Sequence, residues 1–254
     1  MLTIEATALA AGTDESVASM TSNVAEVTEL GVPATAYTTH SALTGVFARA
    51  GTPVRLSRHQ QLALPTDTPD CAYLMHSGTI AVETVTTHRQ IIDFGYAGDL
   101  LEVSLLPTVP HLRLFAIEAC ELWRLRQKPH KPLFTELPDV LRDYQLLSTA
   151  MVKRLVFANI MLGSLTGEQR VASFLVSSGL RQGRIASNRC LLRLPMLRAD
   201  IADFLSLNPD TLSRITSDLQ DHGLIATQGR HQVHILDWHG LCDRAPLSAA
   251  MLQS

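Results

Sequence analysis

The amino-acid sequence predicts an α+β protein in which a strand-rich region, a long helix and a winged helix-turn-helix follow one another. Three observations support this. Residues 40–128 contain short apolar stretches separated by turn residues. Residues 137–162 contain no glycine, and their only proline lies in the first turn, where a helix tolerates it. After residue 163 the order of patterns is helix, short strand, helix–turn–helix and hairpin.

Composition narrows the class of protein. The chain has 254 residues, enough for one large or two ordinary domains, and its formal net charge of −3 indicates that any basic surface is local. No apolar run approaches the roughly 18–20 residues of a membrane span. The first Lys or Arg is Arg49, so the charged segment of a signal peptide is missing. We therefore expect a cytoplasmic protein with no membrane partner.

The cysteines and the N-terminal segment carry little chemistry. The four cysteines lie far apart and form no C-x-x-C pair, which indicates reduced thiols; they are Cys71, Cys120, Cys190 and Cys242. Residues 1–37 contain five acidic and no basic residues and show no sustained periodicity, so we expect an acidic extension that is either mobile or a loosely docked helix.

The strand-rich region, expected over residues 38–135, shows the pattern of half-buried strands. Ile80, Val82 and Val85 are β-branched residues at near-alternate positions, and glycines stand at the breaks between stretches. Several short strands at this spacing predict a sandwich or a roll.

The long helix, expected over residues 136–162, has two apolar faces. One has the three- and four-residue spacing of a helix–helix seam: Leu141, Tyr144, Ser148, Met151, Leu155, Ala158 and Leu162. The other contains Val140, Leu147, Phe157 and Met161. Two faces need two partners, so we expect the strand region on one side and a second copy of the chain on the seam. A helix buried within one subunit is the alternative.

The C-terminal region, residues 163–254, contains a helix expected over residues 209–222. Asn208 is a good N-cap, Pro209 suits the first helical position, and Gly223 suits the end. The predicted buried stripe is Leu212, Ile215 and Leu219, packed on Ile201, Phe204 and Leu205.

The opposite face of this helix has the residue types that read DNA bases. Asp210, Ser213, Arg214 and Ser217 share this face. A carboxylate can accept a hydrogen bond from cytosine N4, and arginine can donate two to guanine. An ordinary solvated polar face is the alternative.

A basic segment leads into this region. Six arginines and no acid lie between residues 170 and 198, as suits phosphate contacts: Arg170, Arg181, Arg184, Arg189, Arg193 and Arg198. The residues that we expect to contact the DNA backbone are Asn208, Thr211, Ser217, Arg198, Arg193 and Arg230. Residues 199–254 hold seven aspartates and three arginines, so specific binding would rely on two subunits.

The stretch MLRADIADFLSLNPDTLSRITSDLQDHGLI resembles the helix-turn-helix of the CRP/FNR family of transcription regulators. The similarity continues upstream through GDLL, the long helix and TGEQRVASFL, and covers about residues 40–245. It implies a β-roll of the cyclic-nucleotide-binding type, a dimerisation helix and a winged helix-turn-helix. The implied partners are double-stranded palindromic DNA, a second copy of the chain and RNA polymerase.

The family's E-x-x-S-R reading motif maps onto Asp210, Ser213 and Arg214, with Asp in place of Glu. Ser206 stands at a turn position that is usually glycine, which costs up to about 1 kcal/mol if the backbone is left-handed there. The resemblance is to the FixK branch, whose members can act without an effector.

The resemblance argues against two known effectors, and we expect no cofactor. Glu102-Val103-Ser104 replaces the family's G-E-L turn, and Pro110-His111 falls near its Arg-Ser pair, so a buried phosphate would have no arginine to pair with. Residues 1–70 contain no cysteine, which excludes an iron–sulfur cluster held near the N-terminus.

Alternative functions remain open from the sequence. Cys71, His76, His88 and His111 could ligate a haem, although ten histidines produce such neighbours by chance. The protein could then be a haem- or small-ligand-gated sensor, or an interaction module whose winged helix no longer binds DNA. Cys190 is either a buried thiol or one whose pKa the nearby arginines lower. No nucleophile–base–orienter set is present, so we expect no enzyme.

Overall fold

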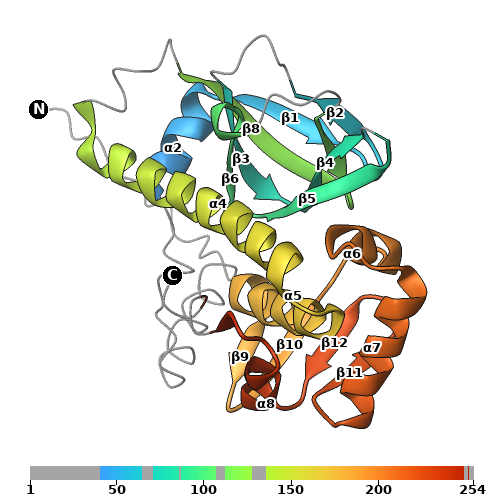
Figure 1. Cartoon of the computed structure of the whole chain (residues 1–254). Helices are drawn as coiled ribbons and strands as arrows, with labels where there is room; N and C mark the ends of the chain where they lie inside the picture. Colours follow the sequence, from blue (N-terminus) through green and yellow to red (C-terminus); the bar gives the residue numbers. More distant parts are fainter. Residues whose placement is uncertain are drawn as a thin grey trace, which may run out of the picture.

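The structure, a computed structural model, describes residues 41–64, 71–85, 87–106, 112–127, 136–248 and 251. The acidic extension expected over residues 1–37 lies outside these residues. Figure 1 shows a strand-rich lobe, a long helix that runs along it, and a second lobe that contains the remaining helices and strands.

In its described residues, the strand-rich lobe consists of an α-helix, a short 3-10 helix and two antiparallel four-stranded sheets, in the orders β1-β8-β3-β6 and β2-β7-β4-β5. Its elements are α2 (Ser41–Ala50), β1 (Thr52–Leu56), β2 (Gln61–Ala63), β3 (Cys71–Ser77), β4 (Thr79–Val85), β5 (Arg89–Tyr96), β6 (Leu100–Glu102), η2 (Val103–Leu105), β7 (Arg113–Ala116) and β8 (Cys120–Arg126). The predicted roll of short strands is confirmed.

Strand β3 shows why the alternation in this region is incomplete. Cys71, Tyr73 and Met75 point into the core between the two sheets. Ala72 and Leu74 point the other way, into a second apolar cluster that α2 and the long helix cover. Because both faces of the strand are buried, apolar residues stand at successive positions.

The long helix is α4 (Pro138–Ser164), with Pro138 at its start as expected. The burial of residues along α4 corrects the predicted helix–helix seam. Met151 and Ala158 are buried within the chain, and the hydroxyl groups of Tyr144 and Ser148 face the strand lobe. The face that remains exposed contains five large apolar residues: Leu141, Leu146, Val152, Val156 and Ile160. Of these, only Leu141 belonged to the predicted seam.

Helix α4 is apolar and long enough to cross a membrane by length and composition alone. Its buried side packs on the strand lobe, where Arg154 forms ion pairs. The helix is therefore part of the folded domain.

Among the described residues, the second lobe contains two helices and four strands beyond the helix-turn-helix, and the strands form one sheet of order β11-β12-β10-β9. Its elements are α5 (Gly167–Gln182), β9 (Arg184–Ala186), β10 (Arg189–Arg193), α6 (Arg198–Phe204), α7 (Pro209–Asp221), β11 (Ile225–Gln228), β12 (Gln232–Ile235) and α8 (Trp238–Asp243). This order confirms the predicted winged helix-turn-helix and adds α8, which no prediction included.

The two lobes meet on strand β5. Phe94 of β5 contacts Phe174 of α5 and Phe204 of α6, with ring centroids 6.3 and 5.2 Å apart. Beside these rings, Arg154 of α4 and Arg181 of α5 pair with Asp93 and Asp99, at 3.1 Å for Arg154–Asp93 and 2.5 Å for Arg181–Asp99. An apolar cluster and an ion-pair cluster therefore join the lobes.

The turn between α6 and α7 needs a left-handed residue, and Ser206 has φ of 51°. A Cβ atom is unfavourable in this conformation.

We expect Ser206→Gly to raise the free energy of unfolding by up to about 1 kcal/mol, measured by urea denaturation. As a control, Ser217→Gly within α7 should lower it by about 0.5 kcal/mol; a lower stability of Ser206→Gly would contradict the assigned strain.

Candidate nucleic-acid interface

Helix α7 begins and ends close to where its capping residues predict. The Oδ1 atom of Asn208 accepts a hydrogen bond from the Asp210 N–H at 2.8 Å, and Pro209 is the first helical residue. Gly223, with φ of 70°, follows the helix and allows the chain to turn toward β11.

The inner side of α7 is the predicted one. Leu212, Ile215 and Leu219 are buried in one apolar cluster together with Ile201, Phe204 and Leu205 of the α6 region. This packing fixes the rotation of α7 about its axis and decides which residues face outward.

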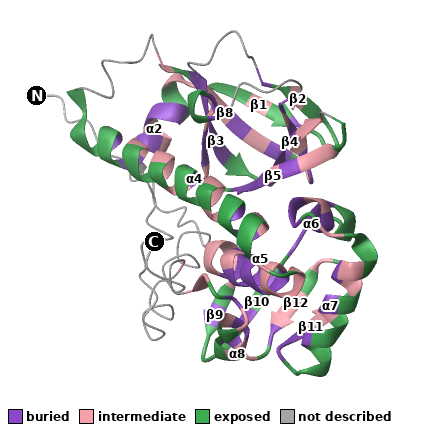
Figure 2. Ribbon diagram, in the orientation of Figure 1, coloured by how far each residue is buried: buried purple, intermediate pink, exposed green. Residues whose placement is uncertain are grey.

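The outer side of α7 carries the four residues expected to face DNA. Asp210, Arg214 and Ser217 are exposed and Ser213 is half-buried. In the described part of the chain, neither the Asp210 carboxylate nor the Arg214 guanidinium has a hydrogen-bond or ion-pair partner. Helix α7 lies at the edge of the lobe with this side toward solvent (Figure 2). The four side chains are therefore free to contact a ligand as large as a duplex.

Four of the residues expected at the DNA backbone flank this face. Arg198 is exposed at the start of α6, and Thr211 is half-buried in the first turn of α7. Arg230 is exposed in the turn between β11 and β12, beside Gly229 with φ of 64°. Asn208 uses its side-chain oxygen to cap α7, so only its amide N–H groups are left for phosphate.

Three of the six arginines in the predicted stripe have acceptors within the chain. Arg170 donates to the carbonyl oxygens of Leu162, Leu165 and Leu205 at 2.7–3.2 Å. Arg181 pairs with Asp99 at the lobe junction.

Arg193, expected at the DNA backbone, donates to Glu118 of the strand lobe at 2.7 Å, and its side chain remains 63% exposed, so its assignment to the DNA backbone stays a prediction. Glu118 lies 75 residues away in the sequence, so a local count of charges could not find it. Arg184, Arg189 and Arg198 remain exposed.

Glu102 occupies the junction between β6 and α4. Its carboxylate accepts hydrogen bonds from the Ser104 and Ser148 hydroxyl groups at 2.7 and 3.0 Å, and from the Gln127 amide at 3.3 Å. Burial alone would raise the pKa of Glu102, but hydrogen bonds from Tyr144 and these groups outweigh it and lower the pKa. The carboxylate is therefore ionised at neutral pH.

Cys190 is a structural thiol. Burial raises its pKa to about 12, so the neighbouring arginines do not lower the pKa as one interpretation of the sequence suggested. Its sulfur lies against Gly183, where an added Cβ would stand 2.4 Å away.

Of the residues considered as haem ligands, the three that the structure describes do not converge. Cys71 is buried in the core between the sheets, His76 packs on Trp123 with ring centroids 4.5 Å apart, and His88 is exposed. His111 and Pro110 lie outside the described residues. Among the residues that the structure describes, no group of three or more His, Cys, Asp or Glu could hold a metal ion.

Comparison with known proteins agrees with this architecture. The family profile of the Crp-like helix-turn-helix domain matches residues 169–244. The nitrogen fixation regulation protein FixK of Azorhizobium caulinodans is 30% identical over 198 residues, which cover 76% of this chain and 78% of the relative. The transcriptional activator protein FnrA of Stutzerimonas stutzeri is 26% identical over 190 residues, covering 74% and 78%.

Solved structures show the same fold. FixK2 from Bradyrhizobium japonicum aligns with a TM-score of 0.67 at 21% identity, over 77% of this chain and 98% of that one. A CooA mutant from Carboxydothermus hydrogenoformans aligns with a TM-score of 0.66 at 18% identity, over 78% and 89%. With a strand roll, a long helix and a winged helix-turn-helix in the same order, this chain belongs to the CRP/FNR family of transcription regulators.

Proposed function

We propose that the protein is a homodimeric regulator of transcription that binds a palindromic DNA site and needs neither a cyclic nucleotide nor an iron–sulfur cluster. Each subunit would place α7 in the major groove. Half-sites would lie about one helical turn, or 34 Å, apart because the two-fold axis of the dimer sets their spacing. We divide the chain into the strand roll (38–135), the dimerisation helix (136–162) and the DNA-binding region (163–254), with 1–37 as an extension.

The observation that carries this proposal is the outer side of α7. A capped helix, rotated by its own packing, presents Asp210, Ser213 and Arg214 without partners in the described part of the chain. These residue types and their spacing suit readout of base edges, with Arg214 as the principal determinant. We assign Asn208, Thr211, Ser217, Arg198 and Arg230 to the DNA backbone.

The dimer would form on the exposed stripe of α4, defined here as Leu146, Val152, Val156 and Ile160. Exposed apolar residues at four- to six-residue intervals along one side of a helix mark an interaction surface. A second copy of the chain is the fitting occupant, since parallel contact of two such helices creates the two-fold symmetry of a palindrome. Leu141, at the N-terminal end, is exposed next to the stripe.

Glu102 supports action without a cyclic nucleotide. Its ionised carboxylate already takes the donors at the β6–α4 junction, and it would repel the phosphate of an anionic ligand placed there. We further expect a cytoplasmic location and contact with RNA polymerase, as suits a regulator of transcription. The family consists of regulators, so we expect no enzymatic activity.

Selection of bound sites from random DNA by the purified protein tests the proposal. We expect a palindrome, and we expect Arg214→Ala to lose roughly 1–3 kcal/mol of binding free energy per half-site, because the guanidinium fork to a guanine is lost. Gln220→Ala, in the last turn of the same helix, is the matched control and should bind as the parent does. Unchanged affinity and base preference for Arg214→Ala would contradict the assignment.

Asp210→Glu probes the short acid in the same selection. Aspartate reaches one methylene less far than the glutamate of the family motif, so it contacts its base through water or discriminates weakly. We expect Asp210→Glu to sharpen the preference at one base pair in each half-site. Equal discrimination by both proteins would show that the length of this side chain is unimportant.

A charged residue in the exposed stripe should dissociate the dimer. We expect Val156→Glu to shift the protein from dimer to monomer in analytical ultracentrifugation, because two buried like charges would face each other. Leu191→Glu, at another exposed apolar position, on β10, is the control and should remain dimeric. A dimeric Val156→Glu protein would place the interface elsewhere.

The buried Cys190 thiol should be inert. Since only the thiolate reacts, a pKa of about 12 predicts that iodoacetamide at pH 8 leaves Cys190 unmodified in the folded protein and labels it in urea. Peptide mass spectrometry distinguishes the labelled from the unmodified Cys190. Rapid labelling in the folded protein would reopen a redox role.

A further inference from the structure

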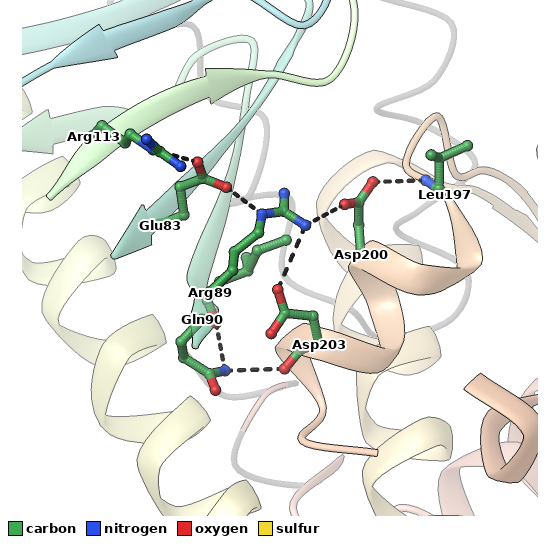
Figure 3. A network of polar contacts seen from close by, with 8 residues as sticks. Glu83, Arg89, Gln90, Arg113, Leu197, Asp200 and Asp203 are labelled. Atoms are coloured by element: carbon green, nitrogen blue, oxygen red, sulfur yellow. Dashed lines mark hydrogen bonds and ion pairs between the residues drawn. The ribbon is translucent and has the colours of Figure 1, made fainter. Parts of the chain in front are cut away.

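A buried carboxylate links the strand roll to the helix-turn-helix (Figure 3). The Glu83 side chain on β4 is fully buried and accepts hydrogen bonds from two arginines, Arg113 Nε at 2.7 Å and Arg89 Nε at 2.6 Å. Arg113 lies directly opposite Glu83 on the neighbouring strand β7. Glu83 is therefore fixed within the roll and in turn fixes the guanidinium of Arg89.

Arg89 reaches from the roll to α6. Its NH1 atom donates to Asp200 Oδ1 at 2.8 Å and lies 3.5 Å from Asp203 Oδ2. Its guanidinium also lies over the Phe115 ring, 5.2 Å from the centroid. A planar guanidinium can hold carboxylates of two lobes at once in a fixed geometry, which a lysine cannot.

The contact extends over the whole length of α6. Asp200 accepts the Leu197 N–H at 3.1 Å, so the carboxylate that Arg89 holds also caps the first turn. Gln90, the next residue of β5, donates to the Asp203 carbonyl oxygen at 3.0 Å, near the end of the helix. Two consecutive residues of one strand therefore hold both ends of the helix that precedes α7.

The lobes are also joined by the aromatic contact of Phe94 with Phe174 and Phe204 and, just after the end of β5, by the Arg181–Asp99 ion pair. Charge-assisted hydrogen bonds are directional. The Glu83–Arg89–Asp200 link lies at the start of β5, so it prevents the rotation that the Arg181–Asp99 pair beyond the other end of the strand would permit on its own. In the arrangement it fixes, the outer side of α7 is open to solvent.

We propose that Glu83 and Arg89 are positioning residues for DNA binding, which hold α6, and through it α7, in the orientation that binds the operator. This inference rests on the proposed function. Without the link the lobe samples other angles, and affinity falls in proportion to the fraction of molecules that keep the competent one.

The test compares Arg89→Gln, Asp200→Asn and the double variant in binding to the operator selected by the parent. Asparagine can still accept the Leu197 N–H, so the cap of α6 is retained. Arg89→Gln makes the protein more negative and Asp200→Asn makes it less negative, so a general electrostatic effect on DNA would move the two affinities in opposite directions. We expect both variants to bind about tenfold more weakly, and the double variant no more weakly than the worse single one.

Two further readouts separate positioning from folding. The fraction of protein that binds at saturating DNA, from stoichiometric titration, should equal that of the parent, and the base preference should be unchanged. A merely structural role would lower the active fraction and leave the affinity of the remaining molecules intact. Arg55→Gln, which breaks the exposed Arg55–Glu121 pair on the roll, is the control and should bind as the parent does.

Parental affinity in both variants, affinities that move in opposite directions, a reduced active fraction at parental affinity, or tighter binding would overturn the inference. Tighter binding would mean that the link restrains the lobe. Failure of the parent protein itself to select any DNA would instead overturn the proposed function, and the positioning role with it.

Discussion

Two aspartates, Asp93 on β5 and Asp99 in the turn that follows, hold the three main parts of the molecule together. Arg154 of α4 forms ion pairs with both aspartates, and Arg181 of α5 pairs with Asp99. Burial alone would raise the pKa of Asp99, but Arg181 and Arg154 outweigh it and lower the pKa. Because each buried charge depends on the others, roll, long helix and DNA-binding lobe have interdependent positions.

In the proposed dimer, helix α4 connects this junction to a second copy of the chain. Its inner side meets the roll through Met151, Tyr144 and Ser148, and Glu102 holds the two hydroxyl-bearing residues near β6. Its outer side presents the exposed stripe. The rotation of α4 on the roll therefore sets where the stripe points, and with it the relation between the two copies of α7 in the proposed dimer.

Local signals made α7 predictable and left the surroundings of other residues open. Capping residues, a proline at the start and a clear apolar stripe define α7 within a short stretch. The sequence predicted helix α4 for similar reasons. However, α4 has apolar residues on most of its circumference, so their periodicity could not show which side the roll covers. Arg193 and Arg89 pair with acids 75 and 111 residues away, and only the fold reveals such partners. For these residues, the sequence indicated a charge but not its ion-pair partner.

The shared core on β5 also limits how the protein can be divided. Phe174 and Phe204 of the DNA-binding lobe pack against one another and against Phe94 of the roll. A fragment that began at α5 would expose these rings as an apolar patch, which favours aggregation. The two lobes are therefore not interchangeable modules: a chimaera that gave this winged helix to another roll would have to transplant the surface of β5 as well.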